Sequence, residues 1–485
     1  MNFQAIRNIC GQVLKFEAGF MTLSLLVALL YREYRSAAVF AGVIVVMAAL
    51  SLLLTRRKPE SSAFFAREGV ITVSLSWVII SLFGAMPFLL SGTIPSFIDS
   101  LFESVSGFTT TGATILADVE SVDRSMLFWR SFTHWIGGMG VLMFVVAILP
   151  MAGADPLHMM RAESPGPMKE KLVPKARQTA KILYSIYIGM TLLQIILLLA
   201  GGMPLFDSVV HTLATAGTGG FSIKNASIGA YRSAYIDAVI TIFMILFGIN
   251  FSAYFLLLTR QFKRFLTQEE LRWYIGILLV AMLIITVNLT GTVYQTATES
   301  FRYASFQVAS LMTTTGYATA NYDNWPTLSK WILMLIMYIG ACAGSTGGGI
   351  KVSRIIIILK TLKRQALRII HPRAVSLVKL DGIPVDESVS YGTSVFIIAI
   401  VLISAVSALI VSIDGFDMET SASAVVACIN NVGPGLGMVS PAGNFSSFSP
   451  LSKIVLSLDM LIGRLEVYPI LLLLSPAIWS KRLVI

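Results

Sequence analysis

The sequence predicts an all-α polytopic membrane protein, because its apolar runs are long, its charges are few and its pattern is not that of a barrel. Of 485 residues, 55% are hydrophobic and 13% are charged, whereas soluble chains carry roughly 25% charged residues. An apolar run of about 20 residues spans a bilayer as a helix, and the charges here fall in short clusters between such runs. A membrane β-barrel would show short segments of alternating polarity instead.

Ten apolar segments are candidate membrane spans. In chain order they are residues 18–31, 36–55, 69–91, 125–149, 182–201, 234–258, 273–290, 328–343, 391–413 and 451–479. The even number of spans places both termini on the same side of the membrane.

The basic residues gather on that side. Most of the 36 Lys and Arg lie in the N-terminal tail, after the second span, in the loops 151–181, 260–272 and 351–379, and at the C-terminus. Loops rich in Lys and Arg stay in the cytoplasm, so both termini are predicted to be cytoplasmic. The loops 151–181 and 351–379 are candidate docking surfaces for a partner, or for anionic lipid, which needs no partner.

Acidic residues characterise the opposite, predicted outer face. They would concentrate cations there, unless they are ordinary solvated loop charges. The residues are Asp99, Glu103, Asp118, Glu120, Asp123, Asp207, Glu299, Asp323, Asp414, Asp417 and Glu419.

Four short tracts rich in Thr, Gly and Asn repeat along the chain. They are residues 109–113 (ThrThrThrGlyAla), 217–221 (GlyThrGlyGlyPhe), 313–317 (ThrThrThrGlyTyr) and 430–434 (AsnAsnValGlyPro). When the tracts are aligned on Gly112, Gly220, Gly316 and Gly433, the residue six positions earlier is always small: Ser106, Ala214, Ser310 and Ala427. The repeat predicts four pseudo-symmetric helix–pore loop–helix units around one pore, preceded by two extra transmembrane helices.

This composition suits a dehydrated cation. Rings of backbone carbonyls replace the water around the ion without burying a formal charge, and glycine tolerates the backbone conformations that such rings need. A short helix before each tract would point its negative C-terminal end at the same cavity. The predicted cation-binding residues are Thr110, Thr111, Gly112, Thr218, Gly219, Gly220, Thr314, Thr315, Gly316, Asn431, Val432 and Gly433.

A glycine-rich stretch interrupts the third inner helix. Residues 340–349 read GlyAlaCysAlaGlySerThrGlyGlyGly, and each glycine costs a helix about 1 kcal/mol relative to alanine. We expect an intramembrane loop beneath the four tracts; the alternative is that the glycines allow close helix packing. The expected gating loop includes Gly344, Ser345, Thr346, Gly347, Gly348 and Gly349.

These features resemble the Trk/Ktr/HKT superfamily of potassium transporters, and are most similar to its bacterial TrkH members. The tract at 313–317 and the stretch at 344–351 carry the resemblance most specifically, and it covers essentially the whole chain. It implies uptake of K⁺ and Rb⁺ in preference to Na⁺, with Gly112 associated with the K⁺ preference. It also implies that the loop is a gate and that Arg464 is a positive barrier beside it; a salt bridge from Arg464 to Asp459 or Glu466 is the structural alternative.

The same resemblance implies the setting of the protein. It implies a homodimer in the bacterial inner membrane, in contact with lipid and with a cytosolic nucleotide-binding regulator of the TrkA type. K⁺ is the expected transported ion, bound at the tract residues, and no organic cofactor is expected in this chain. Nucleic acid is not an expected partner, because the basic residues lie where the membrane topology requires them.

The sequence bears on two other functions. A Na⁺- or H⁺-coupled potassium symporter is the alternative to a simple pore, and it would need a coupling-ion site outside the tracts. A membrane-embedded enzyme is not expected, because no HExxH or GxSxG motif occurs. The four histidines, His134, His158, His211 and His371, are widely spaced, and so are Cys10, Cys342 and Cys428.

The expected organisation of the chain has five parts. Residues 1–60 form the two leading helices, 61–155 the first pore repeat, 156–262 the second, 263–370 the third with a gating loop at 340–350, and 371–485 the fourth.

Overall fold

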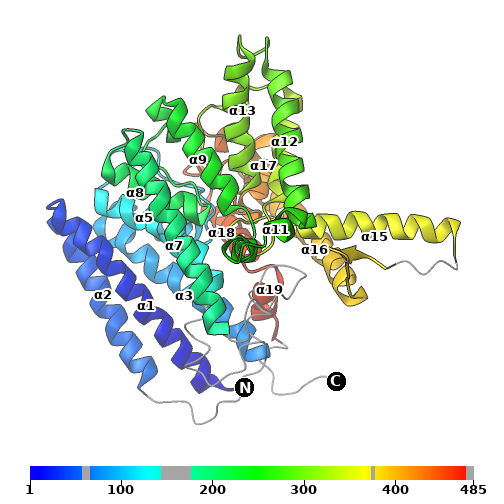
Figure 1. The fold of residues 1–485 in the computed structure, drawn as a ribbon. Coiled ribbons are helices and arrows are strands. Elements are labelled where there is room, and N and C mark those ends of the chain that lie inside the picture. The colour runs from blue at the N-terminus through cyan, green and yellow to red at the C-terminus, as the bar shows by residue number, and fades with distance from the viewer. Residues whose placement is uncertain (57–65, 144–175, 373–376, 477–485) are drawn as a thin grey trace.

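The computed structural model describes residues 1–56, 66–143, 176–372 and 377–476 (Figure 1). Most of the basic loop predicted at 151–181, the end of the span predicted at 125–149, and the C-terminal Lys481 and Arg482 lie outside the described residues.

The described chain is helical apart from loops and one small hairpin. Its α-helices are α1 (Phe3–Leu30), α2 (Tyr34–Thr55), α3 (Ala66–Ser91), α4 (Phe97–Phe108), α5 (Arg124–Met143), α7 (Ala176–Ala200), α8 (Leu205–Gly217), α9 (Ala234–Phe247), α10 (Phe251–Leu258), α11 (Phe262–Thr267), α12 (Glu269–Leu289), α13 (Ala297–Met312), α14 (Thr327–Ile339), α15 (Val352–Ile370), α16 (Glu387–Val411), α17 (Met418–Ile429), α18 (Pro450–Arg464) and α19 (Tyr468–Leu474). Short 3₁₀ turns are η2 (Ser227–Tyr231), η3 (Tyr322–Asn324), η4 (Ser412–Asp414) and η5 (Gly437–Val439). The strands β1 (Lys379–Leu380) and β2 (Ile383–Pro384) pair antiparallel. An all-helical membrane fold is therefore confirmed.

The two leading helices pack as a hairpin along one side of the molecule (Figure 1). A side chain at Gly11 would meet Leu54 and Thr55 of α2, and Ser51 of α2 donates a hydrogen bond of 2.7 Å to the Gly11 carbonyl. Small residues allow helices to approach closely in a membrane, where apolar burial gives little drive for association.

The remaining helices form four units with one plan. Each unit is a long helix, a short helix that ends at one of the Gly-containing tracts, and a returning helix. The long and short helices are α3 and α4, α7 and α8, α12 and α13, and α16 and α17; the returning helices are α5, α9–α10, α14–α15 and α18–α19. The four pseudo-symmetric repeats predicted from the tracts are present in the fold.

The returning helices are more broken than the sequence predicted. Six helices of the described chain are long and apolar enough to cross a membrane, or seven if the pair α9–α10 counts as one span bent by 95°. The predicted continuous spans 234–258 and 451–479 are therefore wrong in detail. The first breaks at residues 248–250, where the Asn250 side chain caps α10. The second breaks at Glu466 and Val467, whose φ angles are 58° and 69°.

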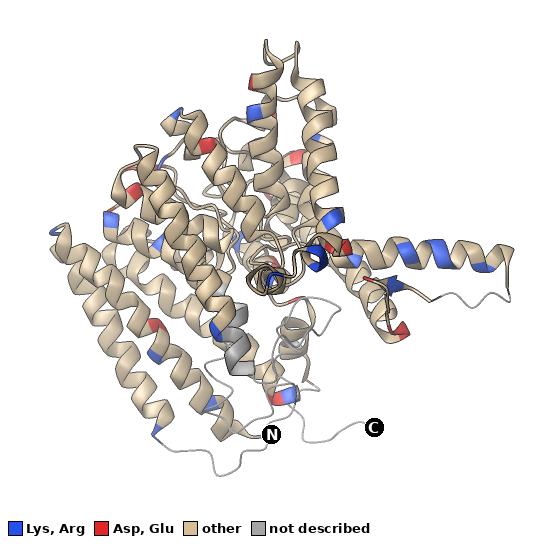
Figure 2. Ribbon diagram, viewed as in Figure 1, with Lys and Arg blue, Asp and Glu red and all other residues tan. Residues whose placement is uncertain are grey.

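Helix α15 projects away from the bundle (Figure 1). Lys and Arg are spaced along it (Figure 2), and its far end exposes Ile369 and Ile370. The three cysteines are buried and free, as expected of small apolar residues.

Candidate cation-binding site

The four tracts have the same hydrogen-bond pattern at the end of their short helices. In each tract, the N–H of the residue before the aligned glycine donates to the carbonyl oxygen five positions earlier, at 2.8–2.9 Å. The four pairs are Thr111–Ser106, Gly219–Ala214, Thr315–Ser310 and Val432–Ala427. The acceptors are the small residues that the sequence alignment brought into register, so the alignment describes equivalent positions, including those of the divergent second and fourth tracts.

The backbone conformation repeats as well. Two positions before the glycine, Thr110, Thr218, Thr314 and Asn431 have φ between 55° and 59°. The aligned glycines Gly112, Gly220, Gly316 and Gly433 have φ between 75° and 95°. A non-glycine residue in this left-handed region is uncommon and costs roughly 1–3 kcal/mol. The same strained backbone conformation at the same place in all four tracts indicates a functional constraint.

The tracts close into a ring, which we call the four-tract ring (residues 109–112, 217–220, 313–316 and 430–433). A side chain on each aligned glycine would collide with a backbone carbonyl of the next tract. These contacts are Gly112 with Gly219, Gly220 with Thr315, Gly316 with Val432, and Gly433 with Thr111. Each carbonyl belongs to the residue before the aligned glycine of its own tract, so the four tracts surround one axis in chain order.

Side-chain oxygens of the tracts also lie at the ring, and most of them are hydrogen-bonded. Thr109 and Thr111 share a hydrogen bond of 2.8 Å, and Thr313 and Thr315 repeat it at 2.8 Å. The Asn431 amide donates to Thr111 across the seam between the fourth and first tracts, at 3.0 Å. Among the described residues, the buried Thr110 hydroxyl has no hydrogen-bond partner. That oxygen is free to serve as a ligand.

A cavity of about 150 Å³ lies at one end of the ring. It is lined by the four aligned glycines and by residues that follow them, among them Thr114, Ser222 and Pro434. The glycine-rich loop lies at the other end of the ring, because it contacts Thr314 and Asn430, which precede the glycines.

A buried ion pair supports the ring from behind. Arg130 of α5 contacts Glu103 of α4 at 2.5 Å, and both side chains are at most 3% exposed. Arg130 also donates to the Ser222 carbonyl just after the second tract, at 2.9 Å, and its guanidinium lies 3.6 Å from the centre of the Phe221 ring. The sequence suggested that Glu103 is an outer-loop charge, but it is buried in an ion pair. Its partner Arg130 makes the contact between the first and second repeats.

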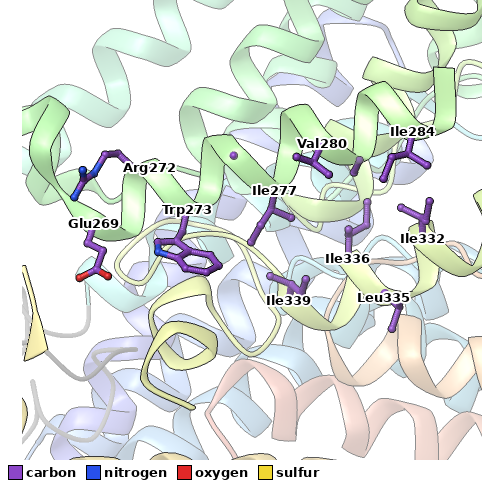
Figure 3. A pocket seen from close by; sticks show the side chains of 12 residues that line it. Glu269, Arg272, Trp273, Ile277, Val280, Ile284, Ile332, Leu335, Ile336 and Ile339 are labelled. Carbon is purple, nitrogen blue, oxygen red and sulfur yellow. The ribbon is translucent and has the colours of Figure 1, made fainter. Parts of the chain in front are cut away.

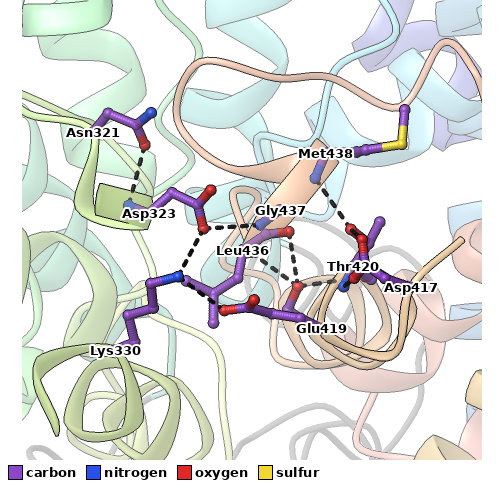
Figure 4. A network of polar contacts seen from close by, with 10 residues as sticks. Asn321, Asp323, Lys330, Asp417, Glu419, Thr420, Leu436, Gly437 and Met438 are labelled. Atoms are coloured by element: carbon purple, nitrogen blue, oxygen red, sulfur yellow. Dashed lines mark hydrogen bonds and ion pairs between the residues drawn. The ribbon is translucent and has the colours of Figure 1, made fainter. Parts of the chain in front are cut away.

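Most of the other acids on the predicted outer face have structural partners. Asp99 pairs with Lys453 at 2.6 Å, and Glu120 with Lys224 at 3.2 Å. Lys330 bridges Asp323 and Glu419, and Asp323 also accepts the Gly437 N–H, which ties the third repeat to the fourth (Figure 4). These carboxylates join neighbouring repeats, so they are not simply a solvated acidic field.

The glycine-rich loop, residues 340–351, contains no helix and lies against the ring. Gly348 donates its N–H to the Thr314 hydroxyl at 2.6 Å, and Gly347 packs against the Thr313 carbonyl. The Cys342 N–H bonds the Gly248 carbonyl at 3.0 Å, and the Gly344 carbonyl accepts from Phe251, also at 3.0 Å. The break between α9 and α10 thus receives the loop, a role that apolar composition did not reveal.

Three cations bind loop carbonyls, and one of them, Arg354 of α15, donates to the Ile350 carbonyl at 3.2 Å. Arg464, at the end of α18, donates to the Thr346 carbonyl at 2.9 Å and to the Gly137 carbonyl of α5 at 2.7 Å. The buried Lys351 donates to the Gly347 carbonyl. The acids named as alternative partners of Arg464 have other contacts: Glu466 pairs with Arg354 at 2.6 Å, and Asp459 accepts from Ser407 at 2.9 Å. The predicted gate residues are therefore brought together beside the ring.

A second cavity, of about 730 Å³, lies between α12 and α14, away from the ring. Isoleucine, leucine and valine side chains line most of its length, with Glu269, Arg272 and Trp273 at one end (Figure 3).

Comparison with known proteins places the chain in a family. The sequence profile of the TrkH family, described as a cation transport protein, matches residues 35–481. The Trk system potassium uptake protein TrkH of Salmonella typhimurium is 39% identical over 485 residues, covering 99% of this chain and all of the relative. The protein of the same name from Escherichia coli K12 is 39% identical with the same coverage.

A solved structure agrees with the sequence relatives. The crystal structure of the potassium transporter TrkH from Vibrio parahaemolyticus superposes with a TM-score of 0.89 at 33% identity, covering 99% of this chain and 100% of that chain. The chain therefore belongs to the TrkH family of cation transport proteins.

Proposed function

We propose that this chain takes up potassium across the bacterial inner membrane through the four-tract ring, with K⁺ and Rb⁺ preferred to Na⁺. The observation that carries the proposal is the closure of the ring, in which each aligned glycine lies against a carbonyl of the next tract. The relatives named as potassium uptake proteins support the choice of ion.

The ring supplies what a dehydrated cation needs. Backbone carbonyls and threonine hydroxyls replace water ligands without a buried formal charge. Four short helices, α4, α8, α13 and α17, end at the tracts, and each contributes a partial negative charge of about half an electron at its C-terminus. The predicted cation-binding residues of the four tracts provide the ligands.

The glycine-rich loop is the gate in this proposal. Gly344 through Gly349 cross the end of the ring opposite the 150 Å³ cavity. Arg464 holds the loop by the Thr346 carbonyl and adds a positive charge that opposes an entering cation. Opening requires the loop to leave Thr314 and Arg464.

Further parts of the proposal concern assembly. Two copies form a homodimer with both termini in the cytoplasm, and lipid surrounds the apolar helices. A cytosolic nucleotide-binding regulator of the TrkA type docks on the basic helix α15, which projects from the bundle and has Lys and Arg positions along its length (Figure 2). The transported K⁺ is the bound ion, and the chain itself catalyses no chemical reaction.

Flux into liposomes tests the function. The full-length chain should pass K⁺ and Rb⁺ faster than Na⁺, and Gly112→Ser or Gly316→Ser should abolish the preference, because each added side chain meets a carbonyl of the next tract. Gly202→Ser is the matched control, since Gly202 has φ 81° but no atom within 4 Å of the new Cβ. No cation flux from the wild type, or equal behaviour of all three variants, would overturn the assignment.

A further inference from the structure

One carboxylate holds both arms of the glycine-rich loop. Glu270, in the first turn of α12, accepts the Ala343 N–H at 2.7 Å and the Ser353 N–H at 3.1 Å, both on Oε1. Ala343 lies on the arm that enters the loop, and Ser353 lies in the first turn of α15, directly after the loop. Glu270 is 9% exposed. A buried carboxylate that accepts two backbone N–H groups forms charge-assisted hydrogen bonds, which are about twice as strong as neutral ones.

The other contacts of the loop differ in kind. They include backbone bonds to the α9–α10 break and the bond to the Thr314 hydroxyl. The Thr346 hydroxyl donates to the Phe247 carbonyl. The cations Arg464, Lys351 and Arg354 bind loop carbonyls. Within the part of the chain that the structure describes, Glu270 is the one carboxylate bonded to backbone N–H groups of the loop and its α15 end. Its side chain therefore joins α12 to both Ala343, in the loop, and Ser353, at the start of α15.

Glu269, the residue before Glu270, is bonded to α15 and to the β1–β2 hairpin, which lie on the predicted cytoplasmic side. Glu269 pairs with Lys360 of α15 at 2.5 Å. Its N–H donates to Asp381, in the turn between β1 and β2, at 2.5 Å, and its carboxylate accepts the Asp381 N–H at 3.3 Å. Lys360 also donates to the Lys379 carbonyl of β1 at 2.7 Å. Successive residues of a helix point about 100° apart, so the start of α12 contacts the loop with one residue and α15 and the hairpin with the other.

We propose that Glu270 is a positioning residue that holds the loop closed, and that Glu269 couples this clamp to α15 and the β1–β2 hairpin. The inference rests on the proposed function, since it concerns the gate of the same pore. Helix α15 continues directly from the loop, and its Lys360 and Ser353 are bonded to adjacent residues of α12. A displacement of α15 away from α12 must therefore break the Ser353–Glu270 bond and release one arm of the loop.

The first experiment compares Rb⁺ flux through the full-length chain in liposomes, without any partner. Glu270→Ala removes both hydrogen bonds and should raise the flux about tenfold or more, since hydrogen bonds to charged groups contribute more than neutral ones. Glu270→Gln keeps an acceptor oxygen but loses the charge, and should raise the flux by a smaller factor. The ratio of Rb⁺ to Na⁺ flux should not change, because Glu270 makes no contact with the ring. Loss of general structure would instead lower flux and selectivity together.

Glu387→Gln is the matched control. Its carboxylate pairs with Arg364 of α15 but is 74% exposed, and the change in charge is the same. This variant should behave as the wild type. A wild type without cation flux would overturn the proposed function itself. Wild-type flux that is unchanged in both Glu270 variants would overturn only the clamp.

Hydrogen exchange gives a second readout that does not depend on transport. In Glu270→Gln, the amides of Ala343 and Ser353 should exchange faster than in the wild type by a factor similar to the rise in flux. The amide of Thr111, in the ring, should keep its protection. Unchanged exchange at both loop amides would contradict the clamp even if Glu270→Ala fails to fold.

The coupling to α15 has its own test. Glu269→Gln should raise flux less than Glu270→Ala, because it loosens α15 without releasing the loop. In the double variant the effect of Glu269→Gln should largely disappear, since the clamp it acts through is gone. Two effects that simply multiply would show that Glu269 acts independently, and would overturn the coupling.

Discussion

The guanidinium of Arg464 donates a hydrogen bond of 2.9 Å to the Thr346 carbonyl, which joins the end of α18 in the fourth repeat to the loop of the third. The same side chain reaches the Gly137 carbonyl of α5 in the first repeat, at 2.7 Å. One cation therefore spans three repeats at the predicted inner end of the ring. In the proposed pore, a permeating cation would pass close to this charge.

Arg464→Ala should raise Rb⁺ flux through the unregulated chain. The substitution removes two hydrogen bonds that a charged group donates to carbonyls. Each contributes about 1.5–3 kcal/mol, and about 1.4 kcal/mol corresponds to a tenfold change. Arg464→Lys keeps the charge and should give a smaller rise. Arg232→Ala, at an exposed site, controls for loss of a positive charge. Liposome flux is the measurement, and a lower flux in the folded Arg464→Ala protein would contradict a closing role.

Gly433→Ala should damage the ring as much as a substitution at Gly112. The fourth tract, AsnAsnValGly, is the least similar of the four, yet Gly433 has φ 95° and an added Cβ would lie 2.6 Å from the Thr111 carbonyl. We expect loss of Rb⁺ over Na⁺ preference. Gly415→Ala is the control, since Gly415 has φ 81° with open space around it. Preserved selectivity in Gly433→Ala would show that the fourth tract does not contribute to the ring.

The fold and the ring could be predicted because their signals are local. Apolar runs identify the long helices, and the aligned glycines with small residues six positions earlier identify the tracts. The left-handed φ of the aligned glycines gives a physical reason for glycine at these positions. The hydrogen bonds to the carbonyls of Ser106 and its equivalents show that the small residues also occupy equivalent positions.

The supporting contacts could not be predicted, because each joins residues distant in sequence. Glu103 appears as one acid among many until Arg130 is seen beside it. Glu270 bonds only backbone N–H groups, and any residue other than proline could supply those. The breaks at 248–250 and 466–467 lie inside apolar segments, where composition does not distinguish a continuous helix from a broken one.

The N-cap of α17 should make stability depend on pH. Asp417 accepts the Thr420 N–H at 2.6 Å, and this bond, with a further one from the Thr420 hydroxyl, lowers the pKa of the carboxyl below its usual value. A lowered pKa in the folded state gives stability that is present above the unfolded pKa, about 3.9, and is lost as pH falls through the folded pKa.

Thermal unfolding in detergent should show the contribution of the Asp417 cap to stability and its dependence on pH. Asp417→Ala should lose about 0.5–2 kcal/mol at neutral pH, whereas Asp417→Asn keeps a capping oxygen and should lose less. Both variants should show a weaker fall in stability below pH 4 than the wild type. Asp386→Ala is the control, because Asp386 occupies the N-cap of α16 without a side-chain capping bond. An equal effect of Asp386→Ala and Asp417→Ala would contradict the assignment.

Glu103→Gln should destabilise the protein far more than substitution of an exposed acid that joins the same two repeats. The change leaves the charge of Arg130 buried without its anion, at a cost of about 3–5 kcal/mol. Arg130 would then be held by the Ser222 carbonyl and the Phe221 ring, both next to the second tract, so selectivity should fall together with stability.

The exposed pair of Glu120 and Lys224 also joins the first and second repeats, and Glu120→Gln should cost at most about 1 kcal/mol. A double variant, Glu103→Gln with Arg130→Met, should be more stable than Glu103→Gln alone, because it removes the unpaired charge. If Glu103→Gln unfolds at the same temperature as Glu120→Gln, the buried pair is not what holds the first and second tracts in register.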